Sequence, residues 1–315
     1  MVTDAYRLTY SSLRWLLALL PGVLFIVTVG TAIVQGHLEG SISAYYGGPV
    51  RDIFVGVLVA EAALLVAYQG STALEDYNFN GAGFYAVLVA LIPTGLVDNI
   101  QALKAGLELS PGGTSPSDLV WSLRFSLTLF GVIAVALVVR EVRSTTRVQK
   151  LLAADKVTVT FVTVTFATLI ALQALVLWQV WVPAPEDVTM DGLRSVPLLR
   201  DIPFLGRLRI HDMAAIFFIA ALAVGVWCHG WPRKAAVNGR ERVAPAALVW
   251  VKAYQVIFVA MVAGPLVAWV VSALFAPGRF VILLEWWEIA LFTTFWVTET
   301  VRQERLPASR PPEIV

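Results

Sequence analysis

Eight long apolar runs separate short polar segments along this 315-residue chain. A helix needs about 20 apolar residues to cross a bilayer, and the runs are close to that length. With 58% hydrophobic and 14% charged residues, the composition is that of an integral membrane protein. We therefore predict an all-α integral membrane helical bundle of about eight transmembrane helices, with residues 1–305 forming one domain. The predicted spans are residues 13–35, 52–69, 83–102, 119–139, 157–182, 211–231, 245–273 and 280–300, and residues 306–315 are predicted to be a disordered cytoplasmic tail.

The positions of the basic residues predict how these spans are oriented. Most of the 23 Lys and Arg residues fall on the cytoplasmic side when the N-terminus is placed there, as expected for cytoplasmic loops. We therefore predict an inner- or plasma-membrane protein with both termini in the cytoplasm and residues 183–210 outside. Membrane lipid is then its surrounding partner. The net charge of +1 gives no basis for nucleic-acid binding, and the sequence does not predict the oligomeric state.

Ionisable and hydroxyl side chains gather near the predicted outer ends of several spans. A charge inside or at the edge of a bilayer is costly, so a one-sided cluster calls for a functional explanation. We interpret this outward cluster as a polar site facing away from the cytoplasm. Its catalytic candidates are Asp52, His211, Glu285 and Glu288, and its substrate-binding candidates are Ser41, Tyr45, Arg51, Asp98 and Asp212.

The carboxylates of the last span suggest the chemistry of the outward cluster. Glu285 and Glu288 are three residues apart, which places them on one helix face. Two carboxylates beside a histidine can bind a divalent metal ion, act as an acid–base pair, or relay ions or protons. The metal and any cofactor therefore stay unassigned. Purely structural roles are also open, because Asp52 and Asp212 can cap helices and the Glu pair can bond to Arg51 or Tyr45.

Two segments carry a resemblance to known membrane proteins. Ser41–Tyr46 reads Ser-Ile-Ser-Ala-Tyr-Tyr, and Arg51–Gly56 reads Arg-Asp-Ile-Phe-Val-Gly. Together with Glu75-Asp76, Ala86–Thr94 and the last span, they resemble a group of uncharacterised bacterial multi-pass membrane proteins. The chain is more distantly similar to the ceramidase-like and adiponectin-receptor-like membrane hydrolases, in which a Ser, an Asp and three His frame a zinc site. That similarity implies hydrolysis of a lipid amide, although the last span has carboxylates where histidines would be expected.

The sequence leaves two classes of function open. One is a membrane-embedded hydrolase that acts on a lipid or another amphiphile. The other is a small-solute or ion-coupled carrier, or a binding or sensor protein. A carrier needs polar access from both sides, and the predicted inner half is sparsely polar apart from Glu61. His229 lies near the inner side and is predicted to take no part in the outward cluster.

Overall fold

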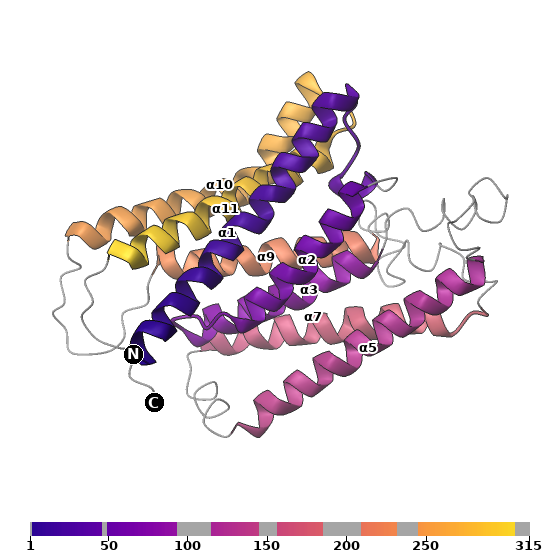
Figure 1. The fold of residues 1–315 in the computed structure, drawn as a ribbon, viewed down its shortest axis with the longest axis horizontal. Helices are drawn as coiled ribbons and strands as arrows, with labels where there is room; N and C mark the ends of the chain where they lie inside the picture. Colours follow the sequence, from indigo (N-terminus) through magenta and orange to yellow (C-terminus); the bar gives the residue numbers. More distant parts are fainter. Residues whose placement is uncertain are drawn as a thin grey trace. The chain divides into compact units, whose positions relative to one another are not determined.

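The computed structural model describes residues 2–45, 49–92, 115–144, 156–184, 209–231 and 245–305. These residues form eight α-helices and one short 3-10 helix, and no strand occurs among them. The elements are α1 (Val2–Gln35), η1 (Ile42–Ala44), α2 (Pro49–Ala67), α3 (Ala73–Leu91), α5 (Pro116–Arg143), α7 (Lys156–Trp181), α9 (Ile210–Gly230), α10 (Pro245–Phe275) and α11 (Phe280–Arg305) (Figure 1). The predicted all-α class is thereby confirmed.

Six of the helices in the described residues are long and apolar enough to cross a membrane. They are α1, α5, α7, α9, α10 and α11, and they make the chain a multi-pass membrane protein. The predicted spans 52–69 and 83–102 correspond to the remaining helices, α2 and α3, so the total of eight spans stays a prediction. The predicted tail 306–315 lies outside the described residues.

Helix α3 begins well before its predicted span. It begins at Ala73 rather than at residue 83, and it includes Glu75 and Asp76 in its first turn. The physical reason is a cap: the Glu75 amide donates to the Thr72 hydroxyl at 3.2 Å, and the Ser71 amide donates to the Glu75 carboxylate at 2.9 Å. These bonds satisfy amide groups that a helix start otherwise leaves without partners. The polar residues that a hydropathy reading excluded therefore belong to the helix.

The chain divides into two compact units, and both boundaries between them fall inside helices. Unit 1 comprises Met1–Phe79 and Ile219–Val315, and unit 2 comprises Asn80–Phe218. In unit 1, α11 packs along both α1 and α10 (Figure 1). The connection between α10 and α11 is a tight turn in which Gly278 has φ +80°, a left-handed conformation that favours glycine.

Aromatic rings form the core of unit 1 beside the site described below. Tyr68 lies edge-on to Trp296 at a centroid distance of 4.9 Å and to Phe79 at 5.6 Å. Phe79 and Trp296 are fully buried. Phe79 also lies directly against Gly225 of α9, where a Cβ atom would overlap its ring. Glycine at 225 therefore lets α9 approach this aromatic core closely.

In unit 2, a buried arginine joins α5 to the end of α7. The Arg124 guanidinium donates to the carbonyl of Val180 at 2.8 Å and to that of Pro183 at 2.6 Å. It also lies over the rings of Trp121 and Trp181, at 4.7 and 5.2 Å from their centroids. A cation at a helix C-terminus satisfies terminal carbonyls and is favoured by the helix dipole. Arg124 is thus accounted for as a structural residue.

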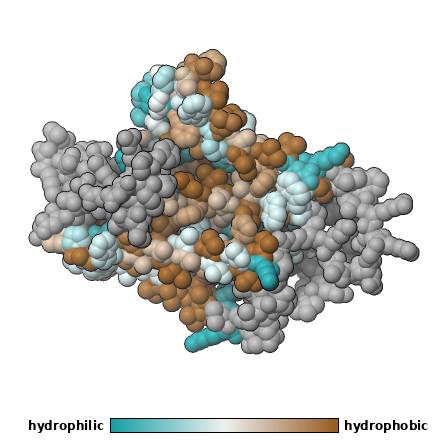
Figure 2. Space-filling view, turned by 180° about the vertical axis from the view of Figure 1, so that it is seen from behind, coloured by the Kyte–Doolittle hydropathy of each residue, from teal (hydrophilic) through white to brown (hydrophobic). Residues whose placement is uncertain are grey.

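Apolar side chains are abundant on the surface of the described residues, as lipid contact requires. Helices α5, α7 and α10 expose many of them, and brown apolar surface is widespread on the face in Figure 2. Examples with more than half of their area exposed are Leu129, Val135, Ile170, Val256, Leu266 and Leu274. Such surface is costly in water and favourable against hydrocarbon.

Candidate functional site

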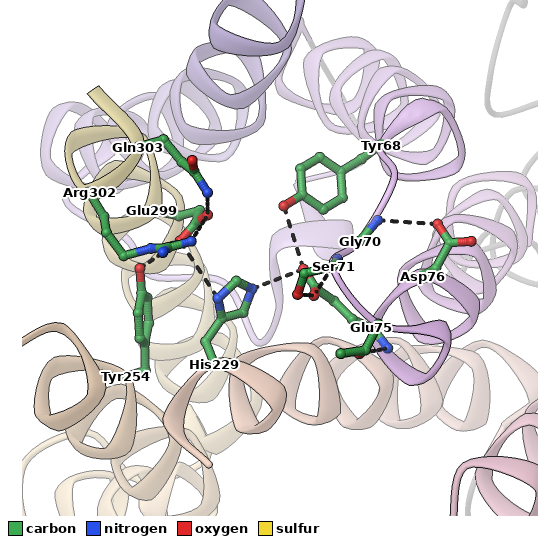
Figure 3. Close-up of polar contacts among 11 residues, drawn as sticks. Tyr68, Gly70, Ser71, Glu75, Asp76, His229, Tyr254, Glu299, Arg302 and Gln303 are labelled. Carbon is green, nitrogen blue, oxygen red and sulfur yellow. Dashed lines mark hydrogen bonds and ion pairs between the residues drawn. The ribbon is translucent and has the colours of Figure 1, made fainter. Parts of the chain in front are cut away.

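Unit 1 contains a largely buried network of polar and ionisable side chains from four helices and from the segment before α3. We call it the His229 network and define it as Ser71, Glu75, His229, Tyr254, Glu299 and Arg302 (Figure 3). Glu75 is on α3, His229 on α9 and Tyr254 on α10, while Glu299 and Arg302 are on α11. The beginnings of α3 and α10 and the ends of α9 and α11 therefore meet at this network.

The imidazole of His229 lies between two carboxylates. Its Nε2 is 2.9 Å from Oε1 of Glu75, and its Nδ1 is 3.6 Å from Oε2 of Glu299 (Figure 3). The side chain is only 7% exposed. The rings of Tyr254 and Phe295 pack against the imidazole at centroid distances of 5.0 and 5.3 Å. Aromatic contacts therefore hold the His229 ring in place, and a carboxylate lies beside each of its two nitrogens.

Glu299 is the most heavily bonded carboxylate of the network. It accepts hydrogen bonds from Tyr254 Oη at 2.6 Å, from Arg302 Nε and Nη2 at 2.8 and 2.7 Å, and from Gln303 Nε2 at 2.8 Å. The residue is fully buried. A buried carboxylate is stable only when it is paired and hydrogen-bonded, and both conditions hold for Glu299.

Glu75 connects the imidazole to the segment between α2 and α3. Its Oε2 accepts from the Ser71 hydroxyl at 2.7 Å, and the Tyr68 hydroxyl lies 3.5 Å from its Oε1. A tyrosine hydroxyl is protonated near neutral pH, so Tyr68 acts as a donor toward Glu75.

The arrangement requires a proton to be shared within the network. A carboxylate can only accept hydrogen bonds, whereas a neutral imidazole has one nitrogen with a hydrogen and one without. With acids at both ring nitrogens, a neutral ring leaves one bare nitrogen facing a carboxylate. The two carboxylates attract an imidazolium, while burial favours the neutral ring. The network can thus bind or release one proton at His229.

Part of the outward cluster is brought together at the start of α11. The Ile42 amide donates to Oε2 of Glu285 at 2.6 Å, and the Ile282 amide donates to the Gly40 carbonyl at 3.1 Å. In the same segment the Ser41 and Ser43 hydroxyls are 3.0 Å apart, and the Tyr45 hydroxyl accepts from the Glu39 amide at 3.3 Å. Glu285 therefore fixes residues 40–45 against α11, which is a structural contact.

The two carboxylates of the last span contact different elements. Glu285 bonds to the segment before α2, whereas Glu288 is 5% exposed and lies against Gly264 of α10. Neither carboxylate oxygen of Glu288 has a hydrogen-bond partner among the described residues. The two carboxylates therefore have different neighbours, and their joint role as a ligand pair stays a prediction. Arg51 and Asp52, in the first turn of α2, are both exposed.

His211 and Asp212 belong to unit 2, so their predicted convergence with Glu285 and Glu288 of unit 1 stays a prediction. Within unit 2, Nδ1 of His211 is 2.8 Å from the Ile92 carbonyl. Asp212 accepts from the Arg209 amide at 3.0 Å, as a residue in the first turn of a helix does when it caps the start. The capping alternative is therefore confirmed for Asp212. Asp98 lies outside the described residues.

No group of three or more His, Cys, Asp or Glu side chains suited to a metal ion occurs among the described residues. The divalent-metal alternative accordingly has no geometric support in that part of the chain. Hydrolysis by a serine nucleophile is not favoured by the His229 network either. The Ser71 hydroxyl donates to Glu75, so the carboxylate stands between the hydroxyl and the imidazole that would have to act as its base.

The sequence reading missed the His229 network, although it noted several members separately. One signal was present: Thr72-Ala-Leu-Glu75 is a Thr-x-x-Glu pattern, which is typical of a helix start. That pattern places Glu75 at a helix end on the same predicted side as His229.

Comparisons with protein-family models, with curated proteins and with solved structures found no match to this chain.

Proposed function

We propose that this multi-pass membrane protein is a proton-coupled carrier of a small solute, with the His229 network as its proton-binding site. The observation that supports the proposal is the position of His229, buried between the carboxylates of Glu75 and Glu299. The three side chains come from three different helices. A change of one proton therefore changes the force that holds α9 to both α3 and α11.

The direction of that change follows from elementary electrostatics. With a proton on His229, the ring donates toward both acids and draws the helices together. Without it, one nitrogen lone pair faces a carboxylate, and the helices are pushed apart. Charges at such short separation in a medium of low dielectric interact by several kcal/mol. That is enough to shift a two-state equilibrium between helix arrangements, as a carrier requires.

The predicted topology places the His229 network on the cytoplasmic side of the membrane. The network lies at the ends of the helices that we place in the cytoplasm, whereas Glu285 and Glu288 lie in the outer half of the last span. Ionisable groups inside membrane spans mark ion and proton pathways. The inner half of unit 1 is therefore not sparsely polar, and the argument from sequence against access from both sides loses its basis.

Proton coupling also gives a role to the His229 network, for which the predicted hydrolase site has no use. A hydrolase built on Asp52, His211, Glu285 and Glu288 needs an activated nucleophile or water, whereas Glu285 is bonded to the Ile42 amide. Proton coupling needs only a protonatable group that connects moving elements. We therefore favour the carrier over the hydrolase.

Nuclear magnetic resonance of the histidine rings tests the proposal directly, because the chain contains only 3 His. Protein labelled with ¹⁵N-histidine would be titrated in lipid bilayers. We expect the His229 ring to change protonation between about pH 5 and about pH 8. In Glu75→Gln the ring should lose its proton at lower pH, because one attracting charge is gone. His229→Gln assigns the signal, and the exposed His37 is the internal reference.

A His229 ring that keeps one protonation state over that whole range, in both proteins, would refute proton coupling at this site. A second measurement tests transport itself. Proteoliposomes loaded with a pH-sensitive dye would receive pools of amino acids, sugars or carboxylic acids. We expect at least one pool to drive proton flux in the wild type, and the same pool to drive none in His229→Gln.

A further inference from the structure

Glu288 is a second buried acid in unit 1, and its surroundings differ from those of the His229 network. It is 5% exposed, and both of its carboxylate oxygens lack a hydrogen-bond partner among the described residues. The packed helices offer it no charge: α1 has no titratable side chain between Arg14 and His37, and α10 has none between Tyr254 and Arg279. An ionised carboxylate in such a place would be uncompensated.

Glu285, His37 and Glu39, which lie near the start of α11, already have partners. Glu285, one turn earlier, accepts from the Ile42 amide. In residues 36–45, which contact this end of α11, His37 and Glu39 pair with each other at 3.3 Å, and the Tyr45 hydroxyl accepts from the Glu39 amide. None of these contacts supplies a positive charge to Glu288. A bound proton would neutralise Glu288 without any charged side chain beside it.

Helix α10 is continuous but lacks one backbone hydrogen bond close to its contact with Glu288. Pro265 has no amide hydrogen to donate to the carbonyl of Met261, one turn earlier in α10. Gly264, directly before it, has no side chain, and a Cβ atom there would overlap Oε1 of Glu288. The Trp287 indole donates to the Ala260 carbonyl at 2.9 Å, which holds this part of α11 against the interrupted turn. Glu288 therefore packs against the α10 turn in which Pro265 leaves the Met261 carbonyl without its usual helical donor.

From this geometry we infer that Glu288 and the Gly264–Pro265 turn of α10 form a proton-binding site inside the membrane. The bound state is the protonated carboxyl, which can donate its hydrogen to a carbonyl of the interrupted turn. The released state requires the α10 turn to move and admit water to the carboxylate. This inference goes beyond the His229 network and needs no proton exchange at His229. Glu299, the α11 member of that network, is eleven residues from Glu288, which is roughly 16 Å along the helix.

Infrared difference spectroscopy tests whether Glu288 is protonated. We expect wild-type protein in bilayers at neutral pH to show the carbonyl band of a protonated carboxylic acid, and Glu288→Gln to lack it. A carboxylate band that disappears in Glu288→Gln instead would overturn the inference. So would loss of the acid band when sodium replaces a large organic cation at constant pH, because the site would then bind a metal cation.

Carbodiimide labelling of the wild-type protein is the second measurement and needs no variant. A membrane-permeant carbodiimide reacts with protonated carboxyl groups, and the adduct is located by mass spectrometry of the peptides. We expect labelling of Glu288 that falls roughly tenfold per pH unit above its titration point. Glu61, also buried and without a hydrogen-bond partner among the described residues, is the internal standard. Labelling of Glu61 without Glu288 would overturn the inference.

A matched pair of glycine variants tests the role of the α10 turn. Gly264→Ala places a methyl group where Glu288 lies, whereas Gly22→Ala meets only Thr293 Cγ2, at an ordinary 3.7 Å. We expect Gly264→Ala to shift the acid band or to lower the labelling of Glu288 several-fold, and Gly22→Ala to change neither. Equal spectra and equal labelling in both variants would show that the carboxyl does not use this turn.

Discussion

Replacing Glu299 by Gln would test how strongly the His229 network holds unit 1 together. Glu299 accepts four hydrogen bonds of 2.6–2.8 Å, from Tyr254, Arg302 and Gln303, and it faces His229 at 3.6 Å. A glutamine side chain has the same shape as glutamate but only one acceptor oxygen. Its amide NH2 group would point at the groups of Tyr254, Arg302 or Gln303 that now donate to Glu299. The change also leaves the guanidinium of Arg302, 24% exposed, without its counter-charge.

The expected cost follows from these contacts. Removing one partner of a buried ion pair typically costs about 3–5 kcal/mol. Because Arg302 retains some contact with solvent, we expect the lower end, about 3 kcal/mol. For a unit of this size, that would lower the midpoint of thermal unfolding by roughly 6–12 °C. Thermal unfolding in detergent, followed by circular dichroism, measures the shift.

Glu304→Gln is the matched control on the same helix. Glu304 is exposed and accepts from the Trp15 indole at 3.1 Å and from the Ser11 hydroxyl at 3.4 Å, so its loss should cost about 1 kcal/mol or less. The double variant Glu299→Gln/Arg302→Gln should cost less than the sum of its single variants, since neither charge is then stranded. If Glu299→Gln unfolds at the same temperature as Glu304→Gln, the network contributes no more than a surface contact and the reasoning is wrong.

Two further predictions concern the outer end of α11 and the topology. Glu285→Ala removes the acceptor of the Ile42 amide and should cost about 1–3 kcal/mol in thermal unfolding, whereas Glu285→Gln keeps an acceptor and should cost under about 1 kcal/mol; equal losses would mean that the charge, not the bond, matters. Reporter fusions at Thr146 and Val237 should give cytoplasmic signals and a fusion at Thr189 an external one, because most basic residues then face inward. A cytoplasmic signal at Thr189 would contradict the predicted orientation.

Hydropathy predicted the helices well where apolar runs and helix lengths coincide. The predicted spans near 157–182 and 211–231 differ from α7 (Lys156–Trp181) and α9 (Ile210–Gly230) by a single residue at each end. The prediction was less accurate where polar residues continue a helix. Helix α1 extends back to Val2, and α3 extends back to Ala73. A helix makes its own backbone hydrogen bonds whether its side chains are polar or apolar, whereas hydropathy measures only the side chains.

The His229 network could not be assembled from the sequence for a related reason. Its ionisable members come from four helices, and α9 and α10 are apolar nearly all round, so periodicity does not indicate which face of each helix meets another. The outward cluster had the opposite difficulty. Its residues were grouped because they are predicted to lie at the same depth in the membrane. Glu285 and Glu288, only three residues apart, nevertheless contact different elements. Equal depth therefore does not show that two side chains are close to each other.

The two acids of α11 also constrain how protons could pass through unit 1. Glu288 and Glu299 are eleven residues apart, which returns to nearly the same helix face because eleven steps of 100° amount to about three turns. Phe292 and Phe295 occupy that face between them and are buried. On that face of α11, a proton released from Glu288 therefore meets apolar rings on the way to Glu299 while these rings stay in place. If both acids exchange protons, they must be loaded in separate steps, and movement of Phe292 or Phe295 becomes the event that connects them. Such separation of two sites is what a carrier needs to avoid a continuous leak across the membrane.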